Sequence, residues 1–335
     1  MTRKRRATLR DVAQAADVSV ATVSRVLNAP ATVSPDTRER VEGAIDSLRF
    51  MRSPAARAIN SGRTRAVAAL VPTLDHAIFA RFLGAMETRL GELGLSLLVA
   101  TTGGDSEREE RKAWGLVEIG AEGLIVSGVS HSAGLDRLAD RHDLPIVATS
   151  FFDPDATMPT IGYDNRAVAR TALDHLSDLG HRRIGVIHGP LDGNDRTQAR
   201  LDALEASSDR AQLSFHAGDL GVGGGCRATA AALALPDRPT ALLCLSDVIA
   251  LGAMFELQRA GLAIPGDVSV IGIDDLSWSK HSAPGLTSVS LPVSEMGAQA
   301  AAALASWIET QERPQHQLLS HRLVPRGSTG PPAGV

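Results

Sequence analysis

Apolar residues in the first fifty positions recur at helical spacing. The positions i, i+3, i+4 and i+7, which form one face of a short helix, are filled by Leu9, Val12, Ala13 and Ala16. Thr8 and Asp11 have the spacing of a capping box, so this helix is expected to begin directly after Thr8. The period breaks at Asp17–Val18, where a tight turn needs a residue that tolerates an unusual backbone angle, as Asp does.

A second and a third short helix follow. Ser19 is a candidate N-cap for the second helix, and the side chains expected to face inward on it are Val20, Val23 and Leu27. Ala21 and Arg25 are four residues apart and share the opposite face. Ser34–Pro35 opens the third helix, because proline suits the first helical position, and its expected inward residues are Val41, Ala44, Ile45 and Leu48. Three short helices, the first two joined by a tight turn, are typical of a helix-turn-helix DNA reader.

The distribution of charge supports this interpretation. The 335 residues carry a formal net charge of −4, but residues 1–65 hold 13 Lys and Arg against 6 Asp and Glu, which leaves −11 for residues 66–335. A basic first segment on an acidic remainder indicates a polyanion bound at one end only. A solvated basic tail would account for residues 1–6, but arginines continue through the predicted helices.

The second helix is therefore expected to enter the major groove. Val20 and Ala21 are small enough for close approach and apolar contact with thymine methyl groups, and Arg25 can pair with a guanine edge. Phosphate contacts, which position a protein without specifying sequence, are expected from Thr8, Ser19, Thr22, Ser24 and Asn28.

From Ala66 onward, short apolar runs alternate with amphipathic helical patterns. Examples of these runs are AVAALV at 66–71, GLIVSG at 123–128, RIGVIHG at 183–189 and ALLCLS at 241–246. Strands separated by helical patterns predict βαβ units and parallel sheets. Because the alternation restarts after Tyr163, the expected fold is an N-terminal all-α helix-turn-helix domain followed by an α/β core of two doubly wound parallel-sheet lobes.

The stretch TLRDVAQAADVSVATVSRVLN at 8–28 resembles the N-terminal signature of the LacI/GalR family of bacterial transcription regulators, and the resemblance continues along nearly the whole chain. Later family-like stretches are GYDNRAVA at 162–169, LGHRRIGVIHGPLD at 179–192, LSDVIALGAM at 245–254 and IPGDVSVIGIDD at 264–275. The resemblance implies a core similar to periplasmic sugar-binding proteins. It also implies that Val20, Ala21 and Arg25 stand where the family reads bases.

The resemblance also sets the expected domains. These are a helix-turn-helix domain at 1–50, a hinge helix or linker at 51–64, and a ligand-binding and dimerisation core at 65–335. In the family the chain crosses between the lobes three times, here near Gly162, Ser290 and Leu319. The N-lobe would then comprise about 65–162 and 290–319, and the C-lobe about 163–289 and 320–335.

The hinge segment contains a start signal at Ser53–Pro54. A helix of this length is marginal alone and should form only when something packs on it. In the family the hinge helix orders on operator DNA and inserts a leucine into the minor groove, and Ile59 occupies that position here. An ordinary flexible linker is the alternative.

Candidate ligand residues lie just past strand ends, where open parallel sheets bind ligands. Ile78 and Phe79 would offer an apolar wall, with a core role as the alternative. Asp274 ends the run VIGID, where a carboxylate could accept hydrogen bonds from sugar hydroxyls or an amine. Asp164 follows IGY at a predicted helix start, where capping is the alternative role.

Arg196 and Arg200 share one helix face, and one of them could clamp a ligand oxygen or anion. By the resemblance, Arg200 best matches the family's ligand-contacting arginine. Ser246 stands where the family usually has asparagine, and Leu220 stands where an aromatic side chain often stacks on the ligand. Both changes remove standard sugar contacts and argue against a typical hexose.

Enzyme classes lack their motifs in this chain. No GxGxxG follows a strand, and no GxxxxGK[ST], GxSxG or HExxH occurs. The histidines are scattered, and His316 and His321 have no cysteine partners, so neither a metal nor a cofactor is expected. Cys226 and Cys244 are too few for a disulfide framework, and Cys244 in the apolar run ALLCL is expected to be a buried free thiol.

The chain also lacks the pattern of a membrane or exported protein. No apolar run approaches the ~18 residues of a membrane span, and Arg10, Asp11 and Gln14 interrupt the stretch where an export signal would be apolar. A cytoplasmic location without a membrane partner is expected. LVPRGS at 323–328 has the letters of a protease site common in expression tags, but it stands where family members end with a strand and an arginine-containing tail.

No heptad run follows that tail, so a homodimer is expected, and two-fold symmetry then requires a pseudo-palindromic operator. The chain is thus expected to be a transcription repressor released from operator DNA by a small, sugar-like effector. The alternative is an exported solute-binding receptor without DNA binding, which would need an export signal and no basic first segment.

Overall fold

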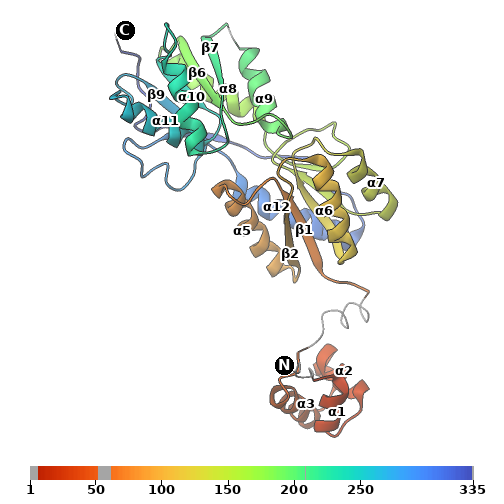
Figure 1. Cartoon of the computed structure of the whole chain (residues 1–335). Coiled ribbons are helices and arrows are strands. Elements are labelled where there is room, and N and C mark those ends of the chain that lie inside the picture. Colours follow the sequence, from red (N-terminus) through yellow and green to blue (C-terminus); the bar gives the residue numbers. More distant parts are fainter. Residues whose placement is uncertain (1–6, 52–61, 208, 334–335) are drawn as a thin grey trace, which may run out of the picture. The chain divides into compact units, whose positions relative to one another are not determined.

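The chain forms two compact units, Met1–Thr64 and Arg65–Val335 (Figure 1). Their structure comes from a computed structural model that describes residues 7–51, 62–207 and 209–333. Ile59 and the hinge helix predicted around it lie outside the described residues.

The first unit contains short helices that begin and end where local signals predict. They are α1 (Leu9–Ala15), α2 (Val20–Asn28), the 3-10 helix η1 (Pro30–Thr32) and α3 (Pro35–Ser47). The predicted capping box is confirmed, since Asp11 N donates to Thr8 Oγ1 at 3.3 Å and Thr8 N donates to Asp11 Oδ2 at 2.7 Å. Asp17 has the predicted unusual backbone, with φ 53°, and the N-cap Ser19 accepts from Thr22 N at 3.1 Å.

Small aliphatic side chains form the core of this unit. Its buried members are Val12, Ala13, Ala16, Val23, Val26, Val41 and Ala44. Two expectations were wrong, because Val20 is 41% exposed and Leu48 is 37% exposed, while Val26 is the second buried residue of α2. Helical side chains lean toward the N-terminus of their helix, so Val20, as the first residue of α2, extends beyond the packed turn.

The second unit contains two six-stranded sheets, each with helices on both faces. We call the sheet that contains β1 and its helices the N-lobe, and the other sheet and its helices the C-lobe. The N-lobe elements are β1 (Ala66–Val71), α5 (Ala77–Glu92), β2 (Ser96–Thr101), α6 (Ser106–Glu118), β3 (Ala121–Ser127), α7 (Ala133–His142), β4 (Ile146–Thr149), β5 (Thr160–Gly162), α12 (Val293–Thr310) and β11 (Gln317–Leu318).

The N-lobe sheet has the strand order β11-β5-β4-β3-β1-β2, and all its paired strands are parallel. Side chains alternate across it: Val67, Ala69 and Val71 of β1 pack with α5 and α12, whereas Ala68 and Leu70 pack with α6 and α7. In Figure 1, α12, coloured blue as part of the chain's last third, lies beside α5 although the two are far apart in sequence.

The C-lobe repeats this architecture. Its elements are α8 (Asn165–Asp178), β6 (Arg183–His188), α9 (Asp195–Glu205), β7 (Gln212–Ala217), α10 (Val222–Leu233), β8 (Ala241–Cys244), α11 (Asp247–Arg259), β9 (Ser269–Asp274), β10 (Thr287–Ser290) and β12 (Arg322–Val324). The order is β12-β10-β9-β8-β6-β7. The predicted fold of two parallel-sheet lobes is confirmed, with the addition that β12 pairs antiparallel to β10 at the sheet edge.

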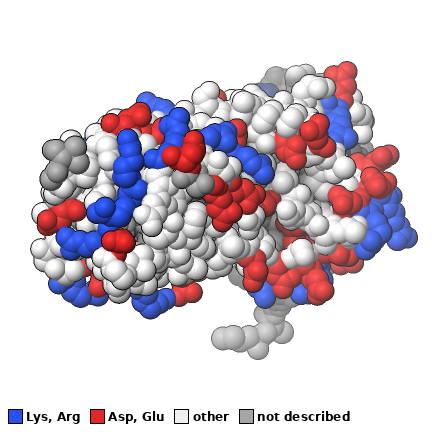
Figure 2. Space-filling model, turned by 90° about the horizontal axis from the view of Figure 1, so that it is seen from above, with Lys and Arg blue, Asp and Glu red and all other residues white. Residues whose placement is uncertain are grey.

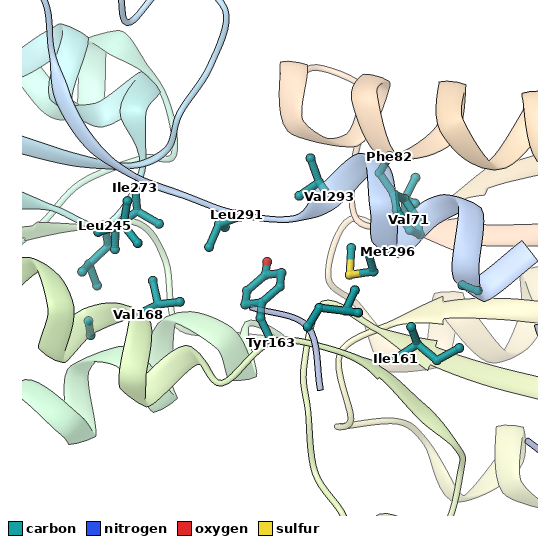
Figure 3. Close-up of a cluster of buried hydrophobic side chains, with 14 of the residues drawn as sticks. Val71, Phe82, Ile161, Tyr163, Val168, Leu245, Ile273, Leu291, Val293 and Met296 are labelled. Carbon is teal, nitrogen blue, oxygen red and sulfur yellow. The ribbon is translucent and has the colours of Figure 1, made fainter. Parts of the chain in front are cut away.

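The chain passes between the two sheets three times, after β5, after β10 and after β11. One cluster of buried side chains runs through this junction (Figure 3). Tyr163 lies between the lobes in that view, with its hydroxyl on the side of Leu291 and Val293. The two lobes therefore share a continuous core along their connecting segments.

The last described segment packs on the C-lobe. The Arg326 guanidinium donates to Leu286 O at 2.6 Å and to Asp275 Oδ1 at 2.6 Å, and Ser328 Oγ donates to Val270 O at 2.6 Å. The stretch LVPRGS is therefore built into the fold. Cys244 is a buried free thiol, as predicted.

Candidate functional site

The first unit presents one exposed strip along α2. Ala21, Arg25 and Asn28 lie on its outward face, and Val20 extends this strip at the helix start. Asn28 Nδ2 donates to Ser24 Oγ at 3.2 Å, which holds the side chains of the last turn together. The strip consists of small apolar groups beside one guanidinium and one amide. The small apolar groups and the guanidinium fit the thymine methyl groups and guanine acceptors of a major groove, and the amide of Asn28 lies at the end of the strip, where a phosphate contact is expected.

Two of the predicted phosphate-contacting residues also cap helices. Thr8 caps α1, and Ser19 caps α2 while its hydroxyl lies 2.9 Å from Thr22 Oγ1. Thr8 and Ser19 are exposed, whereas Thr22 and Ser24 are half-buried. Helix starts also direct backbone N–H groups outward, and such groups bind phosphate oxygens. The hydroxyls of Thr8 and Ser19 thus lie beside backbone N–H groups that could bind the same phosphate group.

In the second unit, a cavity of about 400 Å³ lies between the N-lobe and the C-lobe. Seven of the eight predicted ligand residues line it: Ile78, Phe79, Arg196, Arg200, Leu220, Ser246 and Asp274. They come from the start of α5, from α9, and from the ends of strands in the C-lobe, which is where parallel sheets bring side chains of distant segments together.

Asp164 is the predicted ligand residue that the structure does not bring into this cavity lining. It is the N-cap of α8, and its side chain accepts from Ala167 N at 3.0 Å. Its outer oxygen lies 3.7 Å from the Arg170 guanidinium. The capping role, which the sequence left open as the alternative, describes its position.

Asp274 is a buried carboxylate at the cavity wall. It is 5% exposed and accepts a hydrogen bond from Ser246 Oγ at 2.8 Å. Asp274 and Asp275 have φ angles of 122° and 51°, which non-glycine residues rarely adopt and which are typical of functional sites. Burial raises the pKa of Asp274, while the nearby Arg200 acts in the opposite direction.

A second carboxylate, Asp247, lies behind Asp274 and is fully buried. It accepts from Ser279 Oγ at 2.5 Å, Ser288 Oγ at 2.6 Å and Leu276 N at 2.8 Å. Burial and the charge of Asp274 raise the pKa of Asp247. Two carboxyl groups that oppose each other's ionisation thus stand at the carboxyl end of the C-lobe sheet. Asp247 was not among the residues predicted from the sequence, although it directly follows Ser246.

The guanidinium of Arg200 is held in place by hydrogen bonds to neighbouring protein groups. Its Nη1 donates to Leu245 O at 2.8 Å and its Nε donates to Asn165 Oδ1 at 3.0 Å. Asn165, 1% exposed, in turn donates from Nδ2 to Ser150 O of the N-lobe at 2.9 Å. A chain of buried hydrogen bonds therefore links the cavity arginine to the opposite lobe. Asn165 was also missed, although it adjoins Asp164.

Much of the cavity wall is apolar. Besides the predicted residues, the lining includes Tyr163, Leu276, Trp278, Val293 and Met296. Trp278 packs against the same C-lobe core cluster as Leu220, and both line the cavity, so the lining contains an aromatic side chain from another segment. No pattern in the sequence singled out Trp278, because its place depends on how the loop after β9 folds.

The described residues include no candidate metal site. They contain no group of three or more His, Cys, Asp or Glu side chains placed to hold a metal ion. Within the same part of the chain, no helix is long and apolar enough to cross a membrane. Figure 2 shows acidic and basic side chains interspersed over the face seen from above.

Comparison with known proteins gives two family matches. Residues 8–53 match the model of bacterial regulatory proteins of the lacI family, and residues 173–329 match a periplasmic binding protein-like domain. The first match covers the capped helices α1 to α3, and the second covers most of the C-lobe.

Individual relatives span nearly the whole chain. The HTH-type transcriptional repressor CytR of Escherichia coli (strain K12) is 31% identical over 328 residues, which are 96% of each chain. Among solved structures, the Lac repressor dimer bound to operator and the anti-inducer ONPF superposes with a TM-score of 0.88 at 26% identity, over 97% of this chain and 100% of that one. The transcriptional regulator CelR in complex with cellobiose has a TM-score of 0.68 at 30% identity, over 96% and 100%.

Proposed function

The chain belongs to the lacI family of bacterial regulatory proteins, and from that premise we propose how this DNA-binding, effector-responsive transcriptional repressor reads its operator and senses its ligand. It is not an enzyme. The proposal assigns base reading to α2, effector binding to the cavity between the lobes, and coupling to the angle between the lobes.

Base reading is assigned to Val20, Ala21 and Arg25. The observation that carries this part is the exposed strip on α2, in which small side chains surround one long cationic one. Thr8, Ser19, Thr22, Ser24 and Asn28 are assigned to phosphates. Ile59 is assigned as the wedge of a hinge helix that inserts into the minor groove when operator DNA is bound.

The effector is assigned to the cavity lined by Asp274, Ser246 and the two arginines. A desolvated carboxylate beside a hydroxyl suits a ligand with several hydroxyl donors, and the apolar wall suits the carbon face of a sugar-like ring. The solved complex of CelR with cellobiose supports a carbohydrate-type effector. Leu220 and Ser246, which replace common sugar contacts, make an ordinary free hexose the poorer fit.

The protein is proposed to act as a homodimer in the cytoplasm. The related Lac repressor is a dimer on its operator. In this chain Val99 on the edge strand β2 of the N-lobe is exposed, and Phe255 on α11 of the C-lobe is 46% exposed; the proposed dimer would cover such apolar side chains. A two-fold dimer requires a pseudo-palindromic operator.

Effector binding would change the angle between the lobes and thereby the packing of the paired hinge helices, so operator affinity falls when ligand binds. The rival function, an exported solute receptor, has no use for the matched DNA-binding segment at 8–53.

The test has two arms. Genome-wide footprinting of the purified protein should recover a pseudo-palindrome, and the genes beside it narrow the choice of effector. Recovery of random fragments would contradict the operator assignment.

The second arm uses an effector found by screening sugars and glycosides in a thermal-shift assay. With that effector, Asp274→Ala should keep DNA binding and lose the ligand response. An unchanged response would remove Asp274 from the site.

A further inference from the structure

A contact between the lobes lies next to the effector cavity. Asp195, the first residue of α9 in the C-lobe, accepts two hydrogen bonds on Oδ2 from backbone amides of the N-lobe, from Val129 N at 2.6 Å and Ser130 N at 3.0 Å. Its side chain is 13% exposed. Hydrogen bonds to an ionised acceptor are short and stronger than neutral ones, so this contact joins the lobes at one carboxylate.

The N-lobe side of this contact is shaped to receive the carboxylate. Gly128 has φ 94°, and a Cβ there would lie 2.5 Å from Asp195 Oδ2 and 2.7 Å from Arg196 Nη1. Any other residue at 128 would keep the carboxylate away from the amides of Val129 and Ser130. The absence of a side chain at Gly128 is therefore a condition for the contact.

A buried ion pair holds the same loop from inside the N-lobe. His131 Nδ1 lies 2.8 Å from Glu109 Oε2, and His131 Nε2 lies 3.2 Å from Gly128 O. Both partners can accept hydrogen bonds, so this arrangement favours the imidazole that donates from both nitrogens. The side chains of His131 and Glu109 are 6% and 9% exposed. The loop at 128–131 is thus held by contacts within the N-lobe itself.

The carboxylate also reaches the cavity through its neighbour. Asp195 Oδ1 lies 3.1 Å from Arg196 Nη1, and Arg196 lines the effector cavity. Close by, Gly193 of the C-lobe touches Gly104 of the N-lobe, since a Cβ on Gly193 would lie 1.8 Å from Gly104 O. Gly104 and Gly193 are cavity residues too. The residues that join the two lobes here therefore also form part of the cavity wall.

We propose that Asp195 is the positioning residue of the effector response: its carboxylate latches the C-lobe to the amides of Val129 and Ser130 and, in that position, holds Arg196 at the cavity wall. Opening of the lobes breaks both amide hydrogen bonds and frees Arg196 from its place. The role in effector response rests on the proposed function, whereas the latch is a property of the unliganded chain.

Hydrogen–deuterium exchange on the unliganded full-length protein tests the latch without an operator or effector. Asp195→Ala should speed exchange of the Val129 and Ser130 amides by ~10- to 100-fold, the range expected from loss of charged hydrogen bonds. Asp195→Asn, which keeps an acceptor oxygen, should restore part of the protection. The matched control is Asp202→Ala on the same helix, because Asp202 is 44% exposed and lies outside the contact.

A second variant tests closure without touching the carboxylate. Gly193→Ala places a methyl group against Gly104 O and should hold the lobes apart, so it too should speed exchange at Val129 and Ser130. If Asp195→Ala exchanges there like Asp202→Ala, if its faster exchange is spread evenly over both lobes, or if Gly193→Ala leaves the two amides protected, the latch is refuted. None of these results depends on whether the protein binds a sugar.

Discussion

Replacement of Asp274 by asparagine separates the cost of the buried carboxyl pair from its use in ligand binding. Asparagine keeps a side-chain oxygen that can accept from Ser246 Oγ, which lies 2.8 Å from the carboxylate. It removes the negative charge that, together with burial, raises the pKa of Asp247. Asp274→Asn therefore acts on both titrations while the packing volume stays nearly constant.

The direction in which stability changes with pH follows from the raised pKa values. Asp247 and Asp274 have folded-state pKa values above the ordinary 3.8, so between about pH 4 and those values the folded protein binds more protons than the unfolded chain. Their contribution to stability is complete below about pH 4 and is lost as pH rises through the folded-state pKa values. Each extra bound proton makes the free energy of unfolding fall by about 1.4 kcal/mol per pH unit.

In Asp274→Asn one of the two groups no longer titrates, and Asp247 loses its repulsive neighbour. The stability of the variant minus that of the wild type should therefore rise by about 1 kcal/mol per pH unit, starting near pH 4. Urea denaturation at about pH 4.5, 5.5 and 6.5 measures this difference.

Asp202→Asn is the matched control, because that carboxylate is 44% exposed and its curve should run parallel to the wild type. Parallel curves for Asp274→Asn as well would show that the two carboxyl groups do not impede each other's ionisation, and the account of the C-lobe site would then be wrong.

Arg25→Ala should cost ~1–3 kcal/mol of operator affinity and relax base preference; equal weakening on operator and random DNA in a salt titration would contradict base reading. Burial tends to lower the pKa of His131, but the hydrogen bond and charge of Glu109 outweigh it and raise that pKa above 6.5. The stabilisation by the His131–Glu109 pair is therefore complete below about pH 6.5 and is lost as pH rises through the folded-state pKa of His131. Glu109→Gln should then cost more stability near pH 6 than near pH 9, and an equal cost in urea denaturation at both would refute this. The bond after Arg326 should resist thrombin in the folded protein and become cleavable in urea, with Asp275→Asn accelerating the cut; rapid cleavage of the native chain would show that the segment is not docked.

Local features were predictable from the sequence because their physics is local. The Thr8 capping box and the left-handed Asp17 depend on neighbouring residues only, and both are present. Val20 was misplaced because the end of a packed helix face depends on the partner helix. The alternation of apolar runs was enough for the two parallel-sheet lobes, since both faces of each sheet are covered.

The residues of the candidate site that lie at strand ends could be predicted from the sequence. Asp274 and Ser246 directly follow apolar runs, and both line the cavity. Trp278, Asn165 and Asp195 were not identified, because their importance comes from contacts with segments far away in sequence. Asn165 bonds Ser150 and Arg200, and Asp195 bonds a loop of the other lobe. Such pairings are set by tertiary geometry and leave no local pattern.

The late position of α12 in the chain constrains how the protein can be made. The strands and first helices of the N-lobe leave the ribosome early, but α12, which packs on α5, follows only after the C-lobe strands β6 to β10. Until then Phe82, Met86 and Leu90 lack their cover, and a nascent chain in this state is a client for chaperones. A chain truncated before Val293 would therefore keep the DNA-binding unit but leave the apolar face of α5 without the helix that packs on it.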